Sequence, residues 1–380
     1  MPRPSILICT VGTSLFRPNL EGLKKEDQEG KIRDDLRPLA EAYRQRRWAE
    51  VAQGLATLSP SDRLCGAEIN SIASLIDKQH VPADCGLFFL HSDTDDGRNI
   101  ATILQYYYRS RGHAPVETIG VSDLQDQDPK RFRTQGLRNL ARDICRVIRQ
   151  YTPAACAINA TGGYKAQIAI AVLLGQAIGV PVFYKHELFS EIIAFPPMPV
   201  ALDFEVWMRA SGMLWDLERS AEPIAASLYA ADWDEKYESL VEVVPIDGRD
   251  YLELSPTGQI FHETFRERFR KNRNNLLPPA VPAGQKRPPR LEDAGWPGKY
   301  PEVERFMQRL TEAVAPVVHC ATYYFNPDLP ERTRFRLGAT GIEGIYSDGR
   351  FTVKFHVQTT AQTAGQQAAV VALLNEWLHH

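Results

Sequence analysis

The first half of the chain alternates short apolar runs with longer amphipathic segments. Residues 5–11, 86–91 and 154–159 have the length and composition of buried strands. Strands that alternate with helices predict a parallel sheet with helices on both faces. We therefore expect an α/β Rossmann-like parallel sheet over residues 1–203. Its further strands are expected at residues 116–119 and 180–184, and its helices at residues 99–108, 136–151 and 165–178.

The pattern changes after residue 203. Residues 207–228 and 234–242 are helical in character, with a break or kink expected at Pro223. Residues 243–254 contain two extended runs around Asp247-Gly248. An Asp-Gly turn between extended runs predicts a hairpin. Helices, a small hairpin and a further helix predict a winged helix-turn-helix over residues 204–271. Its acidic segment at residues 231–242 carries few of the basic residues that a DNA-recognition helix needs, so a dimerising or signal-transmitting role is favoured.

The last hundred residues contain a basic segment and a second ordered region. Residues 272–295 are rich in proline, asparagine and basic side chains, which predicts a linker. Residues 296–380 predict a small α+β domain. Its helices are expected at residues 300–314 and 363–378, and its strands at residues 317–324, 333–337, 341–346 and 350–358.

Composition narrows the class of protein. A chain of 380 residues is long enough for two or three domains, and 44% hydrophobic with 24% charged residues is typical of a soluble globular protein. The net charge of −3 argues against a wholly basic nucleic-acid binder. None of the six cysteines forms a C-x-x-C pair, so we expect buried thiols and no metal site. Neither a signal peptide nor a membrane-length apolar run is evident, so a cytoplasmic protein without membrane contact is expected.

Three polar loops of small residues follow three of the predicted strands. Parallel α/β sheets bind ligands beyond the carboxyl ends of their strands. Gly162-Gly163 before a helix, with Lys165 in its first turn, predicts an anion site of this kind. Neither a Walker A motif nor a dinucleotide G-x-G-x-x-G is present. The candidate ligand-binding residues are Thr10, Gly12, Thr13, Ser14, Ser92, Asp93, Thr94, Asn159, Thr161, Gly162, Gly163 and Lys165.

These loops, at residues 10–14 (TVGTS), 92–97 and 159–165 (NATGGYK), resemble the CARF domain, the CRISPR-associated Rossmann fold. The resemblance covers about residues 4–200. It implies a homodimer that needs no cofactor and binds a cyclic oligoadenylate, with cyclic tetra-adenylate as the expected allosteric activator. On this resemblance Thr13, Ser14 and the Gly162-Gly163 backbone hold phosphates, and Lys165 neutralises charge. It also implies possible slow cleavage of the ligand, with Ser14 and Lys165 as the candidate residues.

Basic residues alternate along two predicted strands of the C-terminal region. Arg332, Arg334 and Arg336 are expected on one face of their strand. In residues 350–358, Arg350, Thr352, Lys354, His356 and Gln358 share a face, and Phe351, Val353, Phe355 and Val357 share the other. The apolar face should pack against helical residues 303–310 and 368–377, which leaves the polar face for a substrate.

This pattern, with the glycine-started run 341–346 that ends in tyrosine, resembles the RelE-type mRNA interferases. The resemblance implies metal-independent RNA cleavage by attack of the 2′-hydroxyl. Clustered cations can stabilise the phosphorane, and lysine or histidine can transfer protons. Glu343 departs from the family, which usually carries an arginine there, so individual roles stay open. The candidate catalytic residues are Arg334, Arg336, Lys354 and His356, and the candidate RNA-binding residues are Arg332 and Arg350.

The whole order of segments resembles the CRISPR-Cas-associated mRNA interferases. That resemblance implies a ribonuclease of type III CRISPR defence, activated by cyclic tetra-adenylate, that cuts mRNA in the ribosomal A site. Two other outputs remain open: a ligand-responsive transcription regulator, and a metal-dependent nuclease of DNA or free RNA. A HEPN ribonuclease is not indicated, because its arginine–histidine motif has no convincing match in the C-terminal half.

Overall fold

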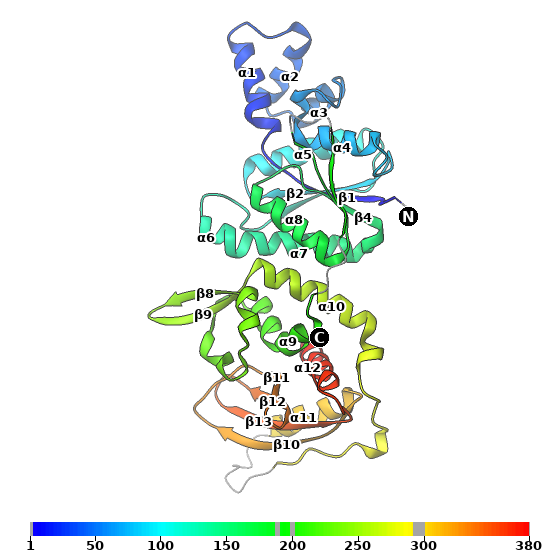
Figure 1. Cartoon of the computed structure of the whole chain (residues 1–380). Coiled ribbons are helices and arrows are strands. Elements are labelled where there is room, and N and C mark those ends of the chain that lie inside the picture. The colour runs from blue at the N-terminus through cyan, green and yellow to red at the C-terminus, as the bar shows by residue number, and fades with distance from the viewer. Residues whose placement is uncertain (1–2, 187–190, 198–201, 292–300, 380) are drawn as a thin grey trace. The chain divides into compact units, whose positions relative to one another are not determined.

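The computed structural model in Figure 1 describes residues 3–186, 191–197, 202–291 and 301–379. The chain divides into two compact units, Met1–Ala201 and Leu202–His380. The first unit ends two residues before the expected end of the sensor segment, residue 203. The expected boundary between residues 295 and 296 lies outside the described residues.

A six-stranded sheet forms the centre of the first unit, in the order β3-β2-β1-β4-β5-β6. β1 to β5 are parallel, which confirms the predicted α/β class, and β6 pairs antiparallel with β5. The edge strand β6 was not predicted, because three residues give too short a pattern to detect. The strands are β1 (Ile6–Thr10), β2 (Gly86–Ser92), β3 (Val116–Val121), β4 (Cys156–Asn159), β5 (Val182–Tyr184) and β6 (Ile193–Phe195).

Helices cover both faces of this sheet (Figure 1). All five residues of β1 are buried, as expected of a strand with helices on each side. α8 has the predicted bounds, since Gly179 takes up the left-handed conformation (φ 80°) that ends it. The helices are α1 (Glu21–Gln28), α2 (Arg37–Arg44), α3 (Trp48–Ala56), α4 (Gly66–Asp77), α5 (Asp95–Arg109), α6 (Pro129–Arg131), α7 (Leu137–Tyr151) and α8 (Lys165–Ile178).

The second unit starts with a helix and a three-stranded antiparallel sheet in the order β7-β9-β8. The predicted hairpin is confirmed, and Asp247 and Gly248 at its turn have φ values of 48° and 75°, as a tight two-residue turn requires. Ser255 caps the next helix by accepting a hydrogen bond from Gly258 N. The elements are α9 (Phe204–Arg219), β7 (Ile224–Ala225), β8 (Val241–Ile246), β9 (Arg249–Leu254) and α10 (Pro256–Leu276).

Two predictions for this region hold only in part. α9 ends at Arg219, before the break or kink expected at Pro223, so an α-helix forms only in the first part of residues 207–228. The expected helix at residues 234–242 is the 3₁₀ segment Glu235–Leu240, and a second 3₁₀ segment, Ala226–Asp232, precedes it. A winged helix-turn-helix therefore stays a prediction.

The C-terminal region is an antiparallel sheet in the order β10-β13-β12-β11, with helices on one face. Apolar residues of β13, such as Phe355, share a core with Met307 of α11 and Leu374 of α12, as predicted. The small α+β class is confirmed, while a specific RelE fold stays a prediction. The elements are α11 (Pro301–Ala313), β10 (Val317–Asn326), β11 (Arg334–Gly338), β12 (Gly341–Ser347), β13 (Thr352–Thr359) and α12 (Ala364–Leu378).

The predicted linker is packed against the C-terminal sheet. Arg287 N and Arg290 N donate hydrogen bonds to carbonyls of β10, and Lys286 Nζ donates to Val314 O (3.0 Å) beyond the end of α11. Ala368 of α12 also joins the core around α9. The segments at residues 204–271 and 296–380 therefore belong to one compact unit. None of the helices in the described ranges is long and apolar enough to cross a membrane.

Candidate functional site

The three predicted loops converge at one edge of the first unit's sheet. β2, β1 and β4 are parallel neighbours, so their carboxyl ends lie at the same edge. The strand order reverses between β1 and β4, which is where parallel α/β sheets bind ligands. The structure thus brings together the loop residues that the sequence singled out.

The loops after β1 and β4 are in direct contact. Thr10 Oγ1 donates a hydrogen bond to Gly162 O at 2.5 Å. A Cβ on Gly12 would lie 2.6 Å from Gly163 N, and a Cβ on Gly162 would lie 2.6 Å from Thr10 O. Only glycine fits at these two positions, so the two loops can pack backbone against backbone.

Glu68 of α4 supports both loops from the protein interior. Its Oε1 accepts a hydrogen bond from Gly12 N at 2.7 Å, and a Cβ on Gly162 would collide with the same oxygen. Glu68 is 1% exposed, and this burial raises the pKa of its carboxyl despite the opposing effect of the Gly12 bond. The sequence analysis missed Glu68 because it lies 56 residues from Gly12 and belongs to no local motif.

Several candidate hydroxyl and amide groups already have partners within the protein. They hold the loops in shape, and Thr94 also caps α5. The bonds run from Ala67 N to Ser14 Oγ (3.0 Å), from Asn159 Nδ2 to Ser71 Oγ (2.8 Å), from Thr161 Oγ1 to Asn159 Oδ1 (2.7 Å), from Gly97 N to Thr94 Oγ1 (3.1 Å), and between Ser92 Oγ and Thr94 Oγ1 (2.8 Å).

Thr13, Asp93 and Lys165 are exposed at this edge. Lys165 is the first residue of α8, so its ammonium adds to the positive end of the helix dipole. Thr13 supplies a hydroxyl from the neighbouring loop. Thr13 and Lys165, together with the glycine backbone, favour an anionic ligand at this edge, whereas the Asp93 carboxylate opposes one.

The second candidate region is the polar face of the C-terminal sheet, where Arg334 is 1% exposed. Its Nη2 donates to Leu228 O at 2.6 Å, and its guanidinium carbon lies 5.0 Å from the centre of the Tyr229 ring. Asp232 Oδ1 lies 3.6 Å from Arg334 Nη2, and Glu331 Oε2 lies 3.7 Å from Arg334 Nη1. The expectation that three arginines share a substrate-facing surface is therefore corrected: the segment Ala226–Asp232 covers the start of β11.

Arg336 and Lys354 are likewise paired with carboxylates. Arg336 contacts Glu343 Oε2 (3.1 Å) and Asp232 Oδ1 (3.3 Å). Burial lowers the pKa of Arg336, but the charges of Asp232 and Glu343 outweigh it and raise the pKa above its ordinary value. Lys354 Nζ lies 2.8 Å from Glu331 Oε1. Glu343, the departure from the family pattern, thus neutralises Arg336.

The candidate RNA-binding residues Arg332 and Arg350 are both exposed. The Arg350 side chain is 84% exposed and pairs locally with Asp348 at 2.7 Å. Arg332 Nη2 lies 3.4 Å from Ser220 Oγ. Each is accessible from solvent.

His356 is the exposed member of the predicted catalytic set. Its ring stacks on Tyr323 with 4.3 Å between ring centroids and 17° between planes. It lines a hollow of about 430 Å³, together with His319 and Gln358. His319 was not singled out in the sequence, because it comes from a different strand and carries no motif.

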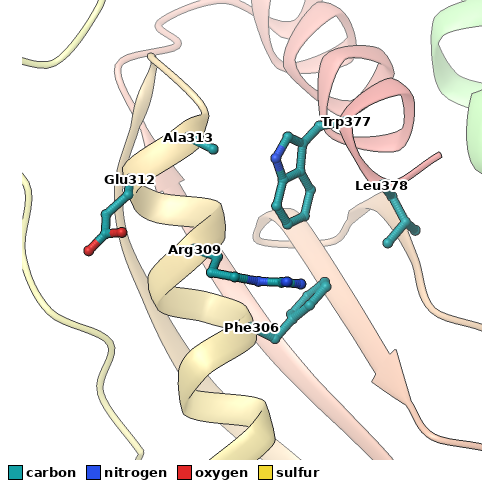
Figure 2. A pocket seen from close by; sticks show the side chains of 6 residues that line it. All are labelled: Phe306, Arg309, Glu312, Ala313, Trp377 and Leu378. Carbon is teal, nitrogen blue, oxygen red and sulfur yellow. The ribbon is translucent and has the colours of Figure 1, made fainter. Parts of the chain in front are cut away.

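A larger hollow, of about 640 Å³, lies between α11 and α12 on the helical face of the same sheet. Figure 2 shows Arg309 alongside Phe306, with Trp377 facing them from α12. This lining is mainly apolar, and it lacks a pair of groups for proton transfer. Within the described ranges, no three His, Cys, Asp or Glu residues are grouped to hold a metal ion.

The first unit is an α/β module in which loops line the sheet edge at the point of strand reversal. Residues 63–198, which include Glu68 and the loops after β2 and β4, match the model of a family described as "CRISPR-associated protein (Cas_APE2256)". No curated protein matches the chain. Among solved structures, Can2 from Sulfobacillus thermosulfidooxidans in complex with cyclic tetra-adenylate is similar at 12% identity, with 95% of this chain and 79% of that chain covered. With a TM-score of 0.24, this likeness establishes neither the fold nor a ligand.

Proposed function

We propose that the chain is a cyclic-oligoadenylate-responsive effector of CRISPR defence, with a CARF-like sensor in the first unit and a ribonuclease in the second. The observation that carries the proposal is the contact between the β1 and β4 loops at the point of strand reversal. This unit is similar over residues 63–198 to a CRISPR-associated family. Cyclic tetra-adenylate, the ligand that the CARF resemblance implies, would place its phosphates against the Gly162-Gly163 backbone, Thr13 and Lys165.

The proposal includes a homodimer. α8 exposes Ala169 and, one turn later, Leu173, whose relative exposure is 44%. An apolar helix face beside a ligand edge suits contact with a second copy, and a ring with two-fold symmetry can be bound by identical loops from two chains. Slow cleavage of the bound ring by Ser14 and Lys165 remains a secondary prediction.

The proposed output is metal-independent cleavage of mRNA at the ribosomal A site. Of the four predicted catalytic residues, His356 is the one that the described conformation exposes. Arg336 is a poor probe of the chemistry, since its removal would also take away the cation that pairs with Glu343 and one of the two that pair with Asp232. His356→Gln is therefore the better test of where the reaction occurs.

The test measures mRNA cleavage in a translating extract with and without cyclic tetra-adenylate. The wild type should cut only with ligand and ribosomes, and EDTA should have no effect. Lys165→Ala should need at least ~10-fold more ligand, which is about 1.4 kcal/mol of binding energy. His356→Gln should not cut even at saturating ligand.

Lys31→Ala is the matched control for Lys165→Ala, because the Lys31 side chain is 71% exposed and pairs locally with Glu29. Intact mRNA with cyclic oligoadenylates of every ring size would contradict the ribonuclease. Promoter binding without RNA loss would then favour the transcription regulator. Activity that EDTA abolishes would favour a metal-dependent nuclease.

A further inference from the structure

The hollow on the polar face of the C-terminal sheet contains two histidines from adjacent strands. His319 of β10 is opposite Gln358 of β13, and His356 of β13 is opposite Ala321 of β10. Opposed residues in an antiparallel pair share a face, so His319 and His356 are diagonal neighbours, with an expected spacing of about 7–8 Å. This spacing lets one phosphodiester fit between the two imidazoles.

The two rings have different surroundings. His356 stacks on Tyr323, which limits rotation of its ring. His319 Nδ1 is buried, and it has no hydrogen-bond partner among the residues that the structure describes. A buried polar atom without a partner is costly and is often retained for function.

Arg287 supplies a cation at the same place. Its backbone N–H donates to Val318 O at 2.9 Å, which fixes the segment along β10. Its Nη2 donates to Gln358 Oε1 at 2.5 Å, so the guanidinium lies beside the residue opposite His319. Arg287 is exposed and can meet a phosphate from solvent.

We propose that this hollow is the RNA-cleaving site, in which His319 and His356 form the acid–base pair and Arg287 binds the scissile phosphate. The assignment rests on the proposed ribonuclease function. One imidazole accepts the proton of the 2′-hydroxyl as its oxygen bonds to phosphorus. The bond from phosphorus to the 5′-oxygen breaks, and the other imidazolium protonates that oxygen. The products are a 2′,3′-cyclic phosphate and a 5′-hydroxyl, with no other reactant consumed.

The charged and titratable neighbours of this pair are few. Tyr323 of β10, Glu343 of β12 and Lys354 of β13 lie next to His356. Burial, together with the charge of Glu343 and a hydrogen bond to it, raises the pKa of Tyr323 to about 12, so this phenol stays protonated across the neutral range. Glu343 in turn pairs with Arg336. Near His319, the adjoining segment carries Lys286, Arg287 and Arg290. The Arg287 guanidinium bonds to Gln358, and Arg290 pairs through its backbone with Ala321.

The experiment uses the full-length chain with saturating activator and ribosomes, and measures single-turnover cleavage against pH. The wild type should show a bell-shaped profile, with one limb for the base and one for the acid. His319→Gln and His356→Gln should each lower the rate at least ~100-fold and each flatten one limb. The dissociation constant of each variant for an RNA with a 2′-deoxy substitution at the cleavage site should differ from the wild-type value by less than about threefold.

His80→Gln in the first unit is the matched histidine control and should leave the rate unchanged, since His80 packs on Phe183 there. A rate within threefold of wild type for His319→Gln would overturn the assignment while leaving the ribonuclease intact. Arg287→Ala should weaken binding of the uncleavable RNA, and unchanged binding would remove Arg287 from the site.

A separate measurement distinguishes failure of this site from failure of the proposed function. Proton NMR of the histidine rings, assigned through the two Gln variants, follows a titration with an uncleavable deoxydinucleotide phosphate. Shifts of the His319 and His356 signals are expected whether or not the chain cuts RNA. If the wild type cuts no RNA, the ribonuclease proposal fails. If neither signal shifts, the site fails.

Discussion

Arg334 and His356 belong to the same antiparallel sheet, and the sequence placed both on its polar face. Arg334 is 1% exposed, and carboxylates of Asp232 and Glu331 lie beside it. His356 is exposed and stacked on an aromatic ring. At the scale of single residues, Arg334 thus acts as part of the protein interior, while His356 is available to a substrate.

Arg334→Ala should destabilise the second unit by about 2–5 kcal/mol, because it leaves a cavity where a long side chain was buried and leaves Leu228 O without its donor. Asp232 and Glu331 would each keep one cation, Arg336 and Lys354 respectively. Five of the six tryptophans lie in residues 202–380, so urea unfolding followed by tryptophan fluorescence reports on this unit. Arg350→Ala is the control, with an 84% exposed side chain, and should change stability by less than about 0.5 kcal/mol. Equal stabilities of the two variants would contradict a structural role for Arg334.

Asp216 predicts a pH dependence of stability. Burial raises the pKa of its carboxyl from 3.8 to about 6, although the Arg334 charge and a hydrogen bond from Tyr229 (3.0 Å) oppose the rise. The unfolded chain therefore loses this proton first, and stability falls as pH rises from about 4 through about 6. Relative to Asp216→Asn, the wild type should lose roughly 2 kcal/mol between pH 4.5 and pH 7.5.

The measurement is urea unfolding of both proteins at pH 4.5 and pH 7.5. Subtracting the free energy of unfolding of Asp216→Asn from that of the wild type at each pH cancels the contributions of other titrating groups. A difference that stays constant with pH would show that Asp216 is already ionised in the folded state at the lower pH.

At the scale of elements, the ligand edge depends on contacts between loops that follow non-consecutive strands. Glu68 of α4 receives the Gly12 amide, and Thr10 bonds to Gly162. Lys165 and Leu173 lie on the same helix, α8, which the sequence predicted with its observed bounds. This helix therefore links the ligand edge to the exposed apolar face proposed for the dimer.

Leu173→Asp should convert the proposed homodimer to a monomer, because a charge would have to be buried in the contact between the two copies. Size-exclusion chromatography with light scattering measures the change. Leu329→Asp is a matched control, since Leu329 is 42% exposed in the second unit and Leu173 is 44% exposed in the first. A wild-type protein that is monomeric at micromolar concentration would contradict the dimer directly.

At the scale of the whole molecule, the two compact units divide the proposed sensing and cutting functions. The residues proposed for ligand binding all lie in residues 1–201, and those proposed for cleavage all lie in residues 202–380. Activation then requires that ligand binding in one unit shift an equilibrium between two states of the other.

Cyclic tetra-adenylate should stabilise the first unit directly. At 100 times the dissociation constant, the expected gain is about 2.7 kcal/mol. Unfolding followed by far-UV circular dichroism reports on both units, and tryptophan fluorescence reports mainly on residues 202–380. We expect the ligand to move the unfolding transition of the first unit toward higher stability, and we expect this shift to be smaller in Lys165→Ala. An identical shift in Lys165→Ala would remove Lys165 from the ligand site.

The sequence by itself determined the positions of most elements and the class of each unit. Strand and helix periodicities, the Asp247-Gly248 turn and the Ser255 cap are local signals, because they depend on hydrogen bonds and burial within a few residues. The convergence of the three loops also followed from sequence, since alternating strands and helices force the parallel arrangement.

Only the tertiary structure decided which distant residues meet. It placed Glu68 behind Gly12, covered Arg334 with the segment Ala226–Asp232, and brought His319 and Arg287 to the hollow beside His356. None of these pairings leaves a local pattern. Each depends on strand order and on the packing of whole elements, which the free energy of the complete fold selects.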